Sequence, residues 1–576
     1  MTTPPVLPTV SSSIRWQSDL DTDEFLDWNM GVGRLVKATL SAAMDGDLTA
    51  LANLIRTDPT LVDCNVGYRE PLYFAVGNNH LDCVRLLVDN GAEVTYRSGD
   101  RTHQRPIERA LDRGFDEIAA VLKAAVEERC NCLYIDDGET LAEHIRERDL
   151  DRVATHLDRH PDHIRACDER GNVPIHWAVL TMNMSMVRAL LDRGADVNAS
   201  RPDGARPVDL VFGDYFFRRR DVPPEALSEN KVMLGYLLAH GAAYDLRTAA
   251  SVGDTEEVRR QIVADPQVLN RLPDYFTWYT GTALCNATMS GHSDIVRMLL
   301  EAGADPSQPE PGSAPHGSAL IGAASRGDEE FVRLLLAHGA DPNGGVESSG
   351  NPCGRAANET IRQLLAEAGG KFEEYDNLKG VPTVLLEKMF GDVPVRYFVD
   401  NRDAAGLRRR LEDSPERALK AFEHALGDRE LMEICLEVDP NLYEKAAPDL
   451  VVNLAGTPRF EDETEQMAKV VDLNQPDWLG RTVLHRVASG EWSTNTASSL
   501  EIAQLLVRHG ARLDSSDQEY SSTPIGWAAR TGQSEMVEYL LREGAPLDAP
   551  FEWATPLAWA RRRNHHDIIR ILEDTH

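Results

Sequence analysis

The sequence has few aromatic residues and no long apolar run. Only 6% of its 576 residues are Phe, Trp or Tyr, although 42% are hydrophobic. This composition suits many small interfaces packed with Leu, Ala and Val rather than one large core. No stretch of 18 apolar residues occurs, so we expect no membrane-spanning helix. The first ten residues have neither a basic nor an apolar region, so we expect no secretory signal and a cytoplasmic location.

Basic residues are outnumbered by acidic ones. Lysine and arginine together number 60 against 93 aspartates and glutamates, which gives a net charge of −33 at pH 7. This charge repels phosphate backbones and anionic lipids, so we expect neither a nucleic-acid partner nor a membrane partner. It favours either simple solubility or a basic protein partner. Lysine is scarce while arginine is abundant, which indicates a GC-rich bacterial genome.

Cysteine is sparse and scattered, with eight residues in all. Only Cys130 and Cys132 are close together, and a C-x-C pair without a second pair is a weak zinc signal. The others mostly fall on helical patterns and are interpreted as small core residues. His565 and His566 are adjacent on a predicted helix and cannot face one ligand. The sequence therefore predicts no metal site and no cofactor.

What the sequence has in abundance is an internal repeat. A pair of leucine-type residues, two or three spacers and a glycine, usually followed by alanine, occurs eight times. Glycine at this position accepts the left-handed conformation that ends a helix. A repeat of this length indicates stacked units rather than one globular core. The copies are Leu87/Gly91, Leu191/Gly194, Leu238/Gly241, Leu300/Gly303, Leu336/Gly339, Leu365/Gly369, Leu506/Gly510 and Leu541/Gly544.

The clearest units contain two helices before that glycine. Pro71 begins the first helix, since proline is tolerated in a first helical turn, and a turn follows at residues 77–80. Leu81 begins the second helix, which Gly91 closes. Similar units span 173–198, 282–307, 318–343, 482–514, 523–548 and 555–572.

This pattern resembles the ankyrin repeat family over about half of the chain. The resemblance implies an all-α ankyrin-repeat solenoid, in which helix-turn-helix units and β-turn fingers form a curved superhelix with a concave groove. It extends to 41–65, 105–125, 141–168 and 248–270, where two units end in Asp58-Pro59 and Asp265-Pro266. The residues that carry it are Val173-Pro174-Ile175-His176-Trp177-Ala178, Gly194-Ala195-Asp196-Val197-Asn198, Gly303-Ala304-Asp305-Pro306, Gly339-Ala340-Asp341-Pro342-Asn343, Thr523-Pro524-Ile525-Gly526-Trp527-Ala528-Ala529 and Thr555-Pro556-Leu557-Ala558-Trp559-Ala560.

The repeats divide the chain into four predicted parts. Asp21 to Trp28 is expected to form a short acidic helix that covers the first repeat. Between the two repeat arrays, one segment keeps helical periodicity but lacks the Gly-Ala marker. It is either a run of degenerate repeats or an inserted helical segment. The parts are an N-terminal tail and capping helix (1–33), a repeat array with insertions at 214–224 and 271–281 (34–370), this helical segment (371–480) and the C-terminal repeats (481–576).

The resemblance also implies where a partner would bind. In the family's Thr-Pro-Leu-His-x-Ala stretch, the residue x points towards the groove. Four of the seven x residues here are large aromatics, which are typical of binding hot spots. Either these side chains contact a partner, or the tryptophans pack against the neighbouring repeat. The x residues are Phe74, Trp177, Asn286, Gly322, Arg486, Trp527 and Trp559, of which all but Gly322 are candidate groove residues.

Two loops depart from the repeat, at 214–224 and 273–281. Long loops in compact repeats are often functional. Aromatics beside arginines could hold a carboxylate, a phosphate or a sugar face. Alternatively, each loop folds its aromatics back onto the array. The candidate pocket residues are Tyr215, Phe216, Arg218, Arg219, Asp274, Trp278 and Tyr279.

Two functions compete. The leading hypothesis is a non-enzymatic scaffold that binds another protein through the groove and fingers. The alternative is an enzyme or a small-ligand binder whose pocket is built from the two insertions. No G-x-S-x-G, Walker loop or H-E-x-x-H motif occurs, so no catalytic residue is predicted. Mimicry of nucleic acid has only the net charge in its favour.

Overall fold

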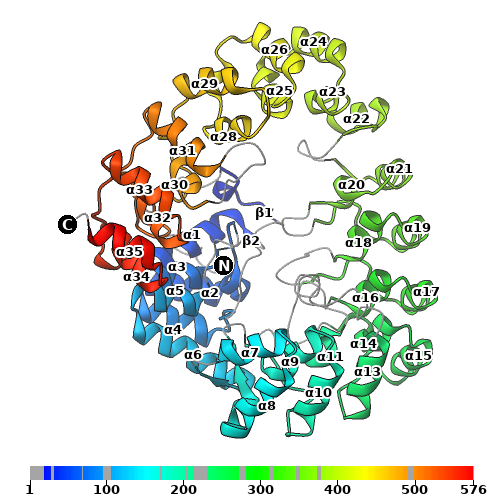
Figure 1. The fold of residues 1–576 in the computed structure, drawn as a ribbon. Helices are drawn as coiled ribbons and strands as arrows, with labels where there is room; N and C mark the ends of the chain where they lie inside the picture. Colours follow the sequence, from blue (N-terminus) through cyan, green and yellow to red (C-terminus); the bar gives the residue numbers. More distant parts are fainter. Residues whose placement is uncertain are drawn as a thin grey trace. The chain divides into compact units, whose positions relative to one another are not determined.

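The fold consists of short helices in consecutive pairs, in two compact units. We analysed a computed structural model, which describes residues 18–26, 31–67, 69–94, 105–135, 138–168, 171–201, 205–211, 230–271, 281–310, 317–345, 350–372, 378–490 and 498–574. The described residues divide into unit 1 (Ser18–Phe372) and unit 2 (Glu373–His576). Within each unit, helix pairs follow one another in chain order (Figure 1).

Unit 1 has two layers of helices. First helices of successive pairs pack on one another, as α1 on α3 and α16 on α18, and second helices do the same, as α15 on α17. Strands β1 (Phe25–Leu26) and β2 (Gly31–Val32) pair antiparallel, while β3 (Leu133–Tyr134) and β4 (Ala166–Cys167) pair parallel. The helices are α1 (Gly33–Asp45), α2 (Leu48–Thr57), α3 (Pro71–Gly77), α4 (Leu81–Asp89), α5 (Pro106–Arg113), α6 (Asp116–Cys130), α7 (Gly138–Arg146), α8 (Leu150–Arg159), α9 (Pro174–Leu180), α10 (Met184–Leu191), α11 (Pro207–Leu210), α13 (Asn230–Ala239), α14 (Leu246–Val252), α15 (Thr255–Ala264), α16 (Ala283–Ser290), α17 (Ser293–Glu301), α18 (Ala319–Arg326), α19 (Glu329–Ala337), α20 (Pro352–Arg355) and α21 (Glu359–Glu367).

Unit 2 follows the same plan. First helices stack as α30 on α32 and α32 on α34, and second helices as α33 on α35. Its apolar core is continuous from Val395 to Leu572. This continuity favours degenerate repeats over a separate insertion in 371–480, although the four-part division stays a prediction. The helices are α22 (Thr383–Phe390), α23 (Val395–Asp400), α24 (Ala404–Asp413), α25 (Ala418–Ala425), α26 (Arg429–Val438), α27 (Leu442–Lys445), α28 (Asp449–Ala455), α29 (Glu461–Val470), α30 (Val483–Ala488), α31 (Ser499–Arg508), α32 (Pro524–Thr531), α33 (Ser534–Arg542), α34 (Pro556–Arg562) and α35 (His566–Glu573).

The pair α9 and α10 shows why the sequence folds in this way. Pro174 occupies the first turn of α9, where a missing N–H costs nothing. Asn183 begins α10 by accepting a backbone N–H of its first turn. Gly194 ends the pair with φ at 87°, and the N–H of Ala195 then bonds the carbonyl of Leu190 at 3.0 Å.

The expected helix at the N-terminal end was wrong for the residues described there. Ser18–Asp21 forms a 3-10 turn, and β1 and β2 follow it as a small hairpin. The acidic side chains are used for ion pairs with α1 rather than for one face of a helix. Asp21, for example, accepts a hydrogen bond from Lys37 at 2.5 Å.

Most second helices end in one of two ways. At glycine junctions, the eight glycines of the sequence motif adopt φ values between 85° and 99°. At proline junctions, an extended residue precedes proline, which opens a 3-10 turn. Junctions of this second kind lie at Asp58-Pro59, His160-Pro161, Asp265-Pro266 and Ser414-Pro415.

Candidate interaction surface

The aromatic x residues lie inside the array. The exposed fraction is 4% for Phe74, 2% for Trp177, 2% for Trp527 and 0% for Trp559. Side chains this deeply buried cannot offer contact area to a partner. The interpretation of these four as groove residues is therefore corrected: they pack within and between repeats, which was the alternative for the tryptophans.

Hydrogen bonds and ring contacts explain the burial of the tryptophans. The indole N–H of Trp177 donates to Oδ2 of Asp168 at 2.8 Å, and that of Trp559 donates to Oγ of Ser522 at 2.8 Å. Trp527 meets Tyr520 edge to face, with ring centroids 4.9 Å apart. Its indole N–H has no hydrogen-bond partner within the described residues. Position x is therefore an inter-repeat core position in these units.

The two polar x residues remain partly exposed but are already engaged. The side-chain amide of Asn286 donates to the carbonyls of Gly281 and Thr282, both at 3.0 Å. Arg486 donates to Oδ2 of Asp449 at 2.8 Å. Both residues stay candidates for partner contact, since neither side chain is buried.

Arginines cover the buried aromatic rings. The guanidinium carbon of Arg146 lies 4.7 Å from the ring centroid of Trp177. Arg530 lies 4.1 Å from that of Tyr520, and Arg562 lies 5.5 Å from that of Trp559. We call Arg146, Arg530 and Arg562 the arginine cover. A guanidinium stacked on a ring is held in place by the quadrupole of the ring.

The arginine cover has a sequence signal that the x residues alone do not give. Arg530 and Arg562 each stand three residues after a tryptophan at x, on α32 and α34. Arg146 holds the same place in α7, three residues before the Asp149 that begins the second helix of its pair. This offset of three places the arginine one helical turn beyond x on the same helix face. The cover therefore lies on the first-helix layer.

His176 and His485 hydrogen-bond the backbone of their own repeats. The backbone N–H of Val173 donates to Nδ1 of His176 at 3.1 Å, and that of Thr482 donates to Nδ1 of His485 at 3.1 Å. Nε2 of His485 bonds the carbonyl of Ser515 at 3.0 Å. Burial lowers the pKa of His485. Both histidines fasten the finger to the first helix and are structural.

The insertion pocket lies outside the described residues. Its candidates Tyr215, Phe216, Arg218, Arg219, Asp274, Trp278 and Tyr279 all fall within 212–229 or 272–280, which the structure does not describe. The hypothesis of a ligand pocket at these loops therefore stays a prediction.

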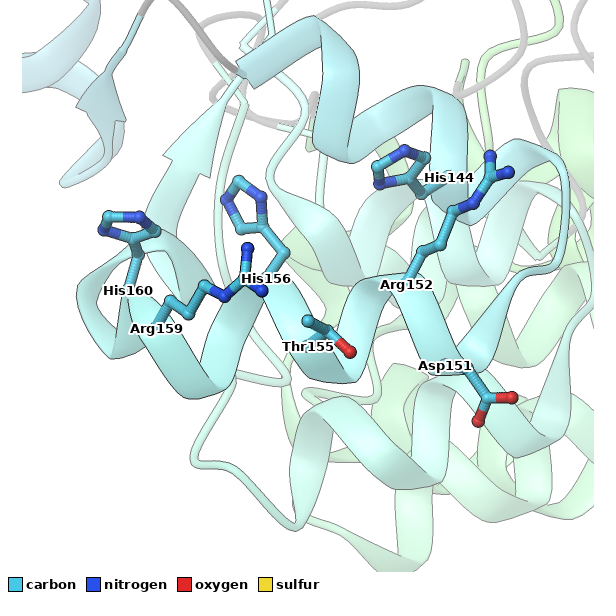
Figure 2. A pocket seen from close by; sticks show the side chains of 7 residues that line it. All are labelled: His144, Asp151, Arg152, Thr155, His156, Arg159 and His160. Atoms are coloured by element: carbon cyan, nitrogen blue, oxygen red, sulfur yellow. The ribbon is translucent and has the colours of Figure 1, made fainter.

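A hollow of about 470 Å³ is lined mainly by α8, with His144 contributed by α7. Figure 2 shows His144 and Arg152 at one end and His160 at the other, with Asp151 pointing away from the imidazoles. Arg152 already pairs with Asp149 at 3.3 Å. The hollow could contact an anion, but no buried cation is directed into it. The lining residues are His144, Asp151, Arg152, Thr155, His156, Arg159 and His160.

The described part of the chain holds no group of three His, Cys, Asp or Glu side chains that could bind a metal ion. None of its helices combines the length and the apolar character that crossing a bilayer requires. Within each unit, the described residues provide a layer of stacked first helices. These features define a helical repeat protein.

Comparison with known families places the chain within this class. It belongs to the ankyrin repeat family. A model of three ankyrin repeats matches more than half of the chain, at residues 40–133, 246–345, 460–551 and 484–575, and a single-repeat model matches 170–201. Repeats of this family generally mediate protein–protein interaction.

The similar proteins match only parts of the chain. Cyclin-dependent kinase 4 inhibitor B of Bos taurus is 29% identical over 22% of this chain and 90% of its own length. A probable E3 ubiquitin-protein ligase of Oryza sativa subsp. japonica, XBOS32, is 24% identical over 30% of this chain but only 40% of its own length. Among solved structures, the human ASB11 ankyrin repeat domain is 20% identical with a TM-score of 0.25, over 40% of this chain and 99% of its own.

Proposed function

We propose that the chain is a non-enzymatic scaffold that binds a protein partner along the first-helix layer and the finger loops. The observation that carries the proposal is the arginine cover. At two separate places, one in each unit, a first-helix arginine stacks on a buried aromatic ring. A stacked guanidinium keeps its planar fork of N–H donors in a fixed orientation, which suits carboxylates and backbone carbonyls of a partner segment.

Local chemistry and net charge favour different partners. A charge of −33 favours a basic partner through long-range attraction. The arginine cover favours a partner segment that carries carboxylates. We propose that the arginine cover recognises a carboxylate-bearing segment of the partner. Salt screens the distant charges, so short-range hydrogen-bonded contacts dominate specificity.

The family and the cysteines add support. The bovine relative is by its name a kinase inhibitor, which is a function exercised on another protein. All eight cysteines are free and buried, as suits a reducing compartment, so we also propose a cytoplasmic location.

The test is affinity capture with three forms of the full chain. In the first variant, Arg146, Arg530 and Arg562 are changed to Ala. In the matched control, three exposed arginines of second helices are changed to Ala instead, namely Arg188, Arg259 and Arg570. Circular dichroism melts confirm that each form is folded.

The proposal expects a partner that wild type and the control retain and that the cover variant loses. Titration with the identified partner should show that the cover variant binds about tenfold more weakly than wild type, or more weakly still, as expected for a binding hot spot. Equal binding by folded cover variant and control would overturn the assignment of this surface.

A further inference from the structure

Three cysteines from two neighbouring helix pairs meet at the β3–β4 strand pair. Cys130 ends α6, Cys132 precedes β3 directly, and Cys167 ends β4. The Sγ atoms of Cys132 and Cys167 are 3.1 Å apart, although the two residues stand one repeat apart in the sequence. A hydrogen bond also joins the side chains of Cys130 and Cys132. The C-x-C pair thus gains a third thiol that the sequence pattern does not reveal.

The backbone holds the two sulfur atoms together. The parallel register pairs Leu133 with Ala166 and Tyr134 with Cys167, directly beside Cys132. Gly138 packs so closely on the carbonyl of Cys167 that an added Cβ would lie 2.4 Å from it. The three thiols are at most 6% exposed. The pair is therefore preorganised and closed to large reagents.

The electrostatics give the two sulfurs different roles. Hydrogen bonding with Cys130 and Cys167, with a smaller contribution from the charge of Arg165, lowers the pKa of Cys132. The bond to Cys132 and burial raise the pKa of Cys167. The two sulfur atoms are therefore inequivalent, and the lower pKa makes Cys132 the one that we expect to react first. By contrast, burial raises the pKa of Cys64 and that of Cys435.

We propose that Cys132 and Cys167 are a redox site that hydrogen peroxide converts to a disulfide, joining two adjacent repeats covalently. The thiolate of Cys132 attacks one peroxide oxygen, the O–O bond breaks, and the departing hydroxide takes a proton to become water. Cys132 is then a sulfenic acid. Cys167 loses its proton and attacks the Cys132 sulfur, and a second water leaves. Two thiols and one peroxide thus give one disulfide and two waters.

Peroxide is the oxidant that the burial of the site admits. It is close to water in size, whereas a disulfide such as oxidised glutathione would have to displace the strands to reach either sulfur. The described residues around the three thiols also offer no metal-binding group of three ligands. A reversible disulfide between free thiols is typical of redox sensing in reducing compartments.

The test is peptide mapping of the full chain, which is treated with peroxide while folded and then unfolded in the presence of excess alkylating reagent, so that every free thiol is blocked before digestion. Trypsin leaves Cys130 and Cys132 on peptide 130–146 and Cys167 on peptide 166–170. We expect these two peptides to be linked, with fragmentation placing the bond at Cys132. Cys64 and Cys435 should remain thiols. The oxidised protein should also melt several degrees higher, because the bond restrains the unfolded chain.

Two variants separate chemistry from folding. Cys167→Ser should abolish the linked peptide and leave Cys132 as a sulfenic acid that a dimedone probe captures when the treated protein is unfolded in its presence. Cys130→Ala should keep the link but form it several-fold more slowly, because it removes one hydrogen-bond partner of Cys132. The proposal is overturned if wild type stays unlinked while folded, or if Cys132 reacts no faster than Cys435. It is also overturned if the thiols copurify with zinc or copper.

Discussion

The glycine junctions and the proline junctions end the same kind of helix by different physical means. At Gly339 the chain turns with φ at 91°, a conformation that glycine adopts without a steric penalty. At Asp58 the chain stays extended, with φ at −141°, and the carboxylate accepts the N–H of Thr60 while Pro59 prevents further helix. The glycine junction depends on the absence of a side chain at Gly339, whereas the proline junction depends on the capping carboxylate of Asp58 and on the ring of Pro59.

The comparison explains why the segment 371–480 loses the Gly-Ala marker but remains helical. Its helix α24 ends at Ser414 with φ at −143°, before Pro415, as α2 and α15 do in unit 1. A repeat search based on glycine therefore misses pairs that end in proline. The lesson is that the position of a helix end, rather than the residue found there, is the repeating feature.

Bridging side chains reinforce the glycine junctions. Nδ2 of Asn343 donates to the carbonyl of Gly369 at 3.1 Å, and its Oδ1 accepts the N–H of Lys371 at 2.8 Å. One amide thus satisfies both a donor and an acceptor of the next junction. The same pair of contacts occurs at Asn198, Asn270 and Asn474.

The largest expected effect comes from breaking a glycine junction. Gly339→Ala should lower the free energy of unfolding by about 1–2 kcal/mol, because φ near 91° is unfavourable for any residue with a Cβ. An added Cβ at this position would meet no atom within 4 Å, so the cost is confined to the backbone. Urea denaturation of the full chain measures the shift.

Replacing a glycine inside a helix should change the free energy of unfolding in the opposite direction. Gly235 lies inside α13, has no atom within 4 Å of an added Cβ, and does not need a positive φ. Gly235→Ala should therefore stabilise the chain by about 0.5–1 kcal/mol, the difference in helix propensity. Equal effects of the two substitutions would show that the junction does not depend on glycine's conformational freedom.

The second prediction concerns mild acid and the segment 371–480, which contains the proline junction at Ser414-Pro415. His424 is half-buried on α25, and its Nδ1 accepts from Arg396 at 3.0 Å. Burial and the charge of Arg396 lower its pKa to about 4. A histidine with a lowered pKa contributes stability that is present above about pH 6.5 and is lost as the pH falls towards 4.

His424→Leu should remove this loss. Between pH 7 and pH 5, the free energy of unfolding of wild type should fall by about 1 kcal/mol more than that of the variant, after allowance for partial exposure. His566→Leu, at an exposed position on α35, is the control and should follow wild type. A variant with the same pH profile as wild type would contradict the assignment.

The sequence predicted the fold better than the surface. The roles of Pro174, His176 and Gly194 can be predicted from the sequence, because each acts within a few residues. The proline opens a helix, the histidine hydrogen-bonds the nearby backbone, and the glycine ends a helix with a positive φ. Burial of Trp177 depends on the neighbouring pair, where Arg146 covers the ring. Helical periodicity shows which residues share a face but not what packs against that face.

The cysteines show the same limit over a longer distance. Cys130 and Cys132 are close in the sequence, so the sequence alone shows this pair. Cys167 comes from the next repeat and is brought to Cys132 by the pairing of β3 with β4. No spacing rule for metal or redox motifs covers a partner one repeat away. Contacts between repeats are thus the part of this molecule that sequence patterns predict least.

The third prediction tests the proline junction directly. Asp58→Ala should cost about 1 kcal/mol, because Asp58 accepts the backbone N–H of Thr60 at 3.1 Å and its hydroxyl at 2.6 Å. Asp58→Asn keeps an acceptor and should cost less. Denaturation midpoints of both variants measure the difference, and equal losses would mean that the proline alone ends the helix.

The smallest expected change in stability comes from Asp63. This residue holds the position in its repeat that Asn270 holds in another. Both residues stand five positions after the junction aspartate, and both accept a backbone N–H two residues beyond the next glycine, Glu93 for Asp63 at 3.0 Å. A carboxylate cannot donate to the glycine carbonyl as the amide does. Desolvation by the surrounding protein raises the pKa of Asp63 to about 6, although the side chain keeps an exposed edge.

Asp63→Asn should therefore stabilise the chain at pH 7, by a few tenths of a kcal/mol up to about 1, since the exposed edge screens part of the cost. A carboxyl group whose pKa is raised on folding destabilises the folded state above that pKa and ceases to do so as the proton binds. The advantage of the variant should thus shrink from pH 6 downwards and vanish near pH 4. Denaturation at pH 7 and pH 4 measures this, and a less stable variant at pH 7 would show that the amide does not donate to Gly91.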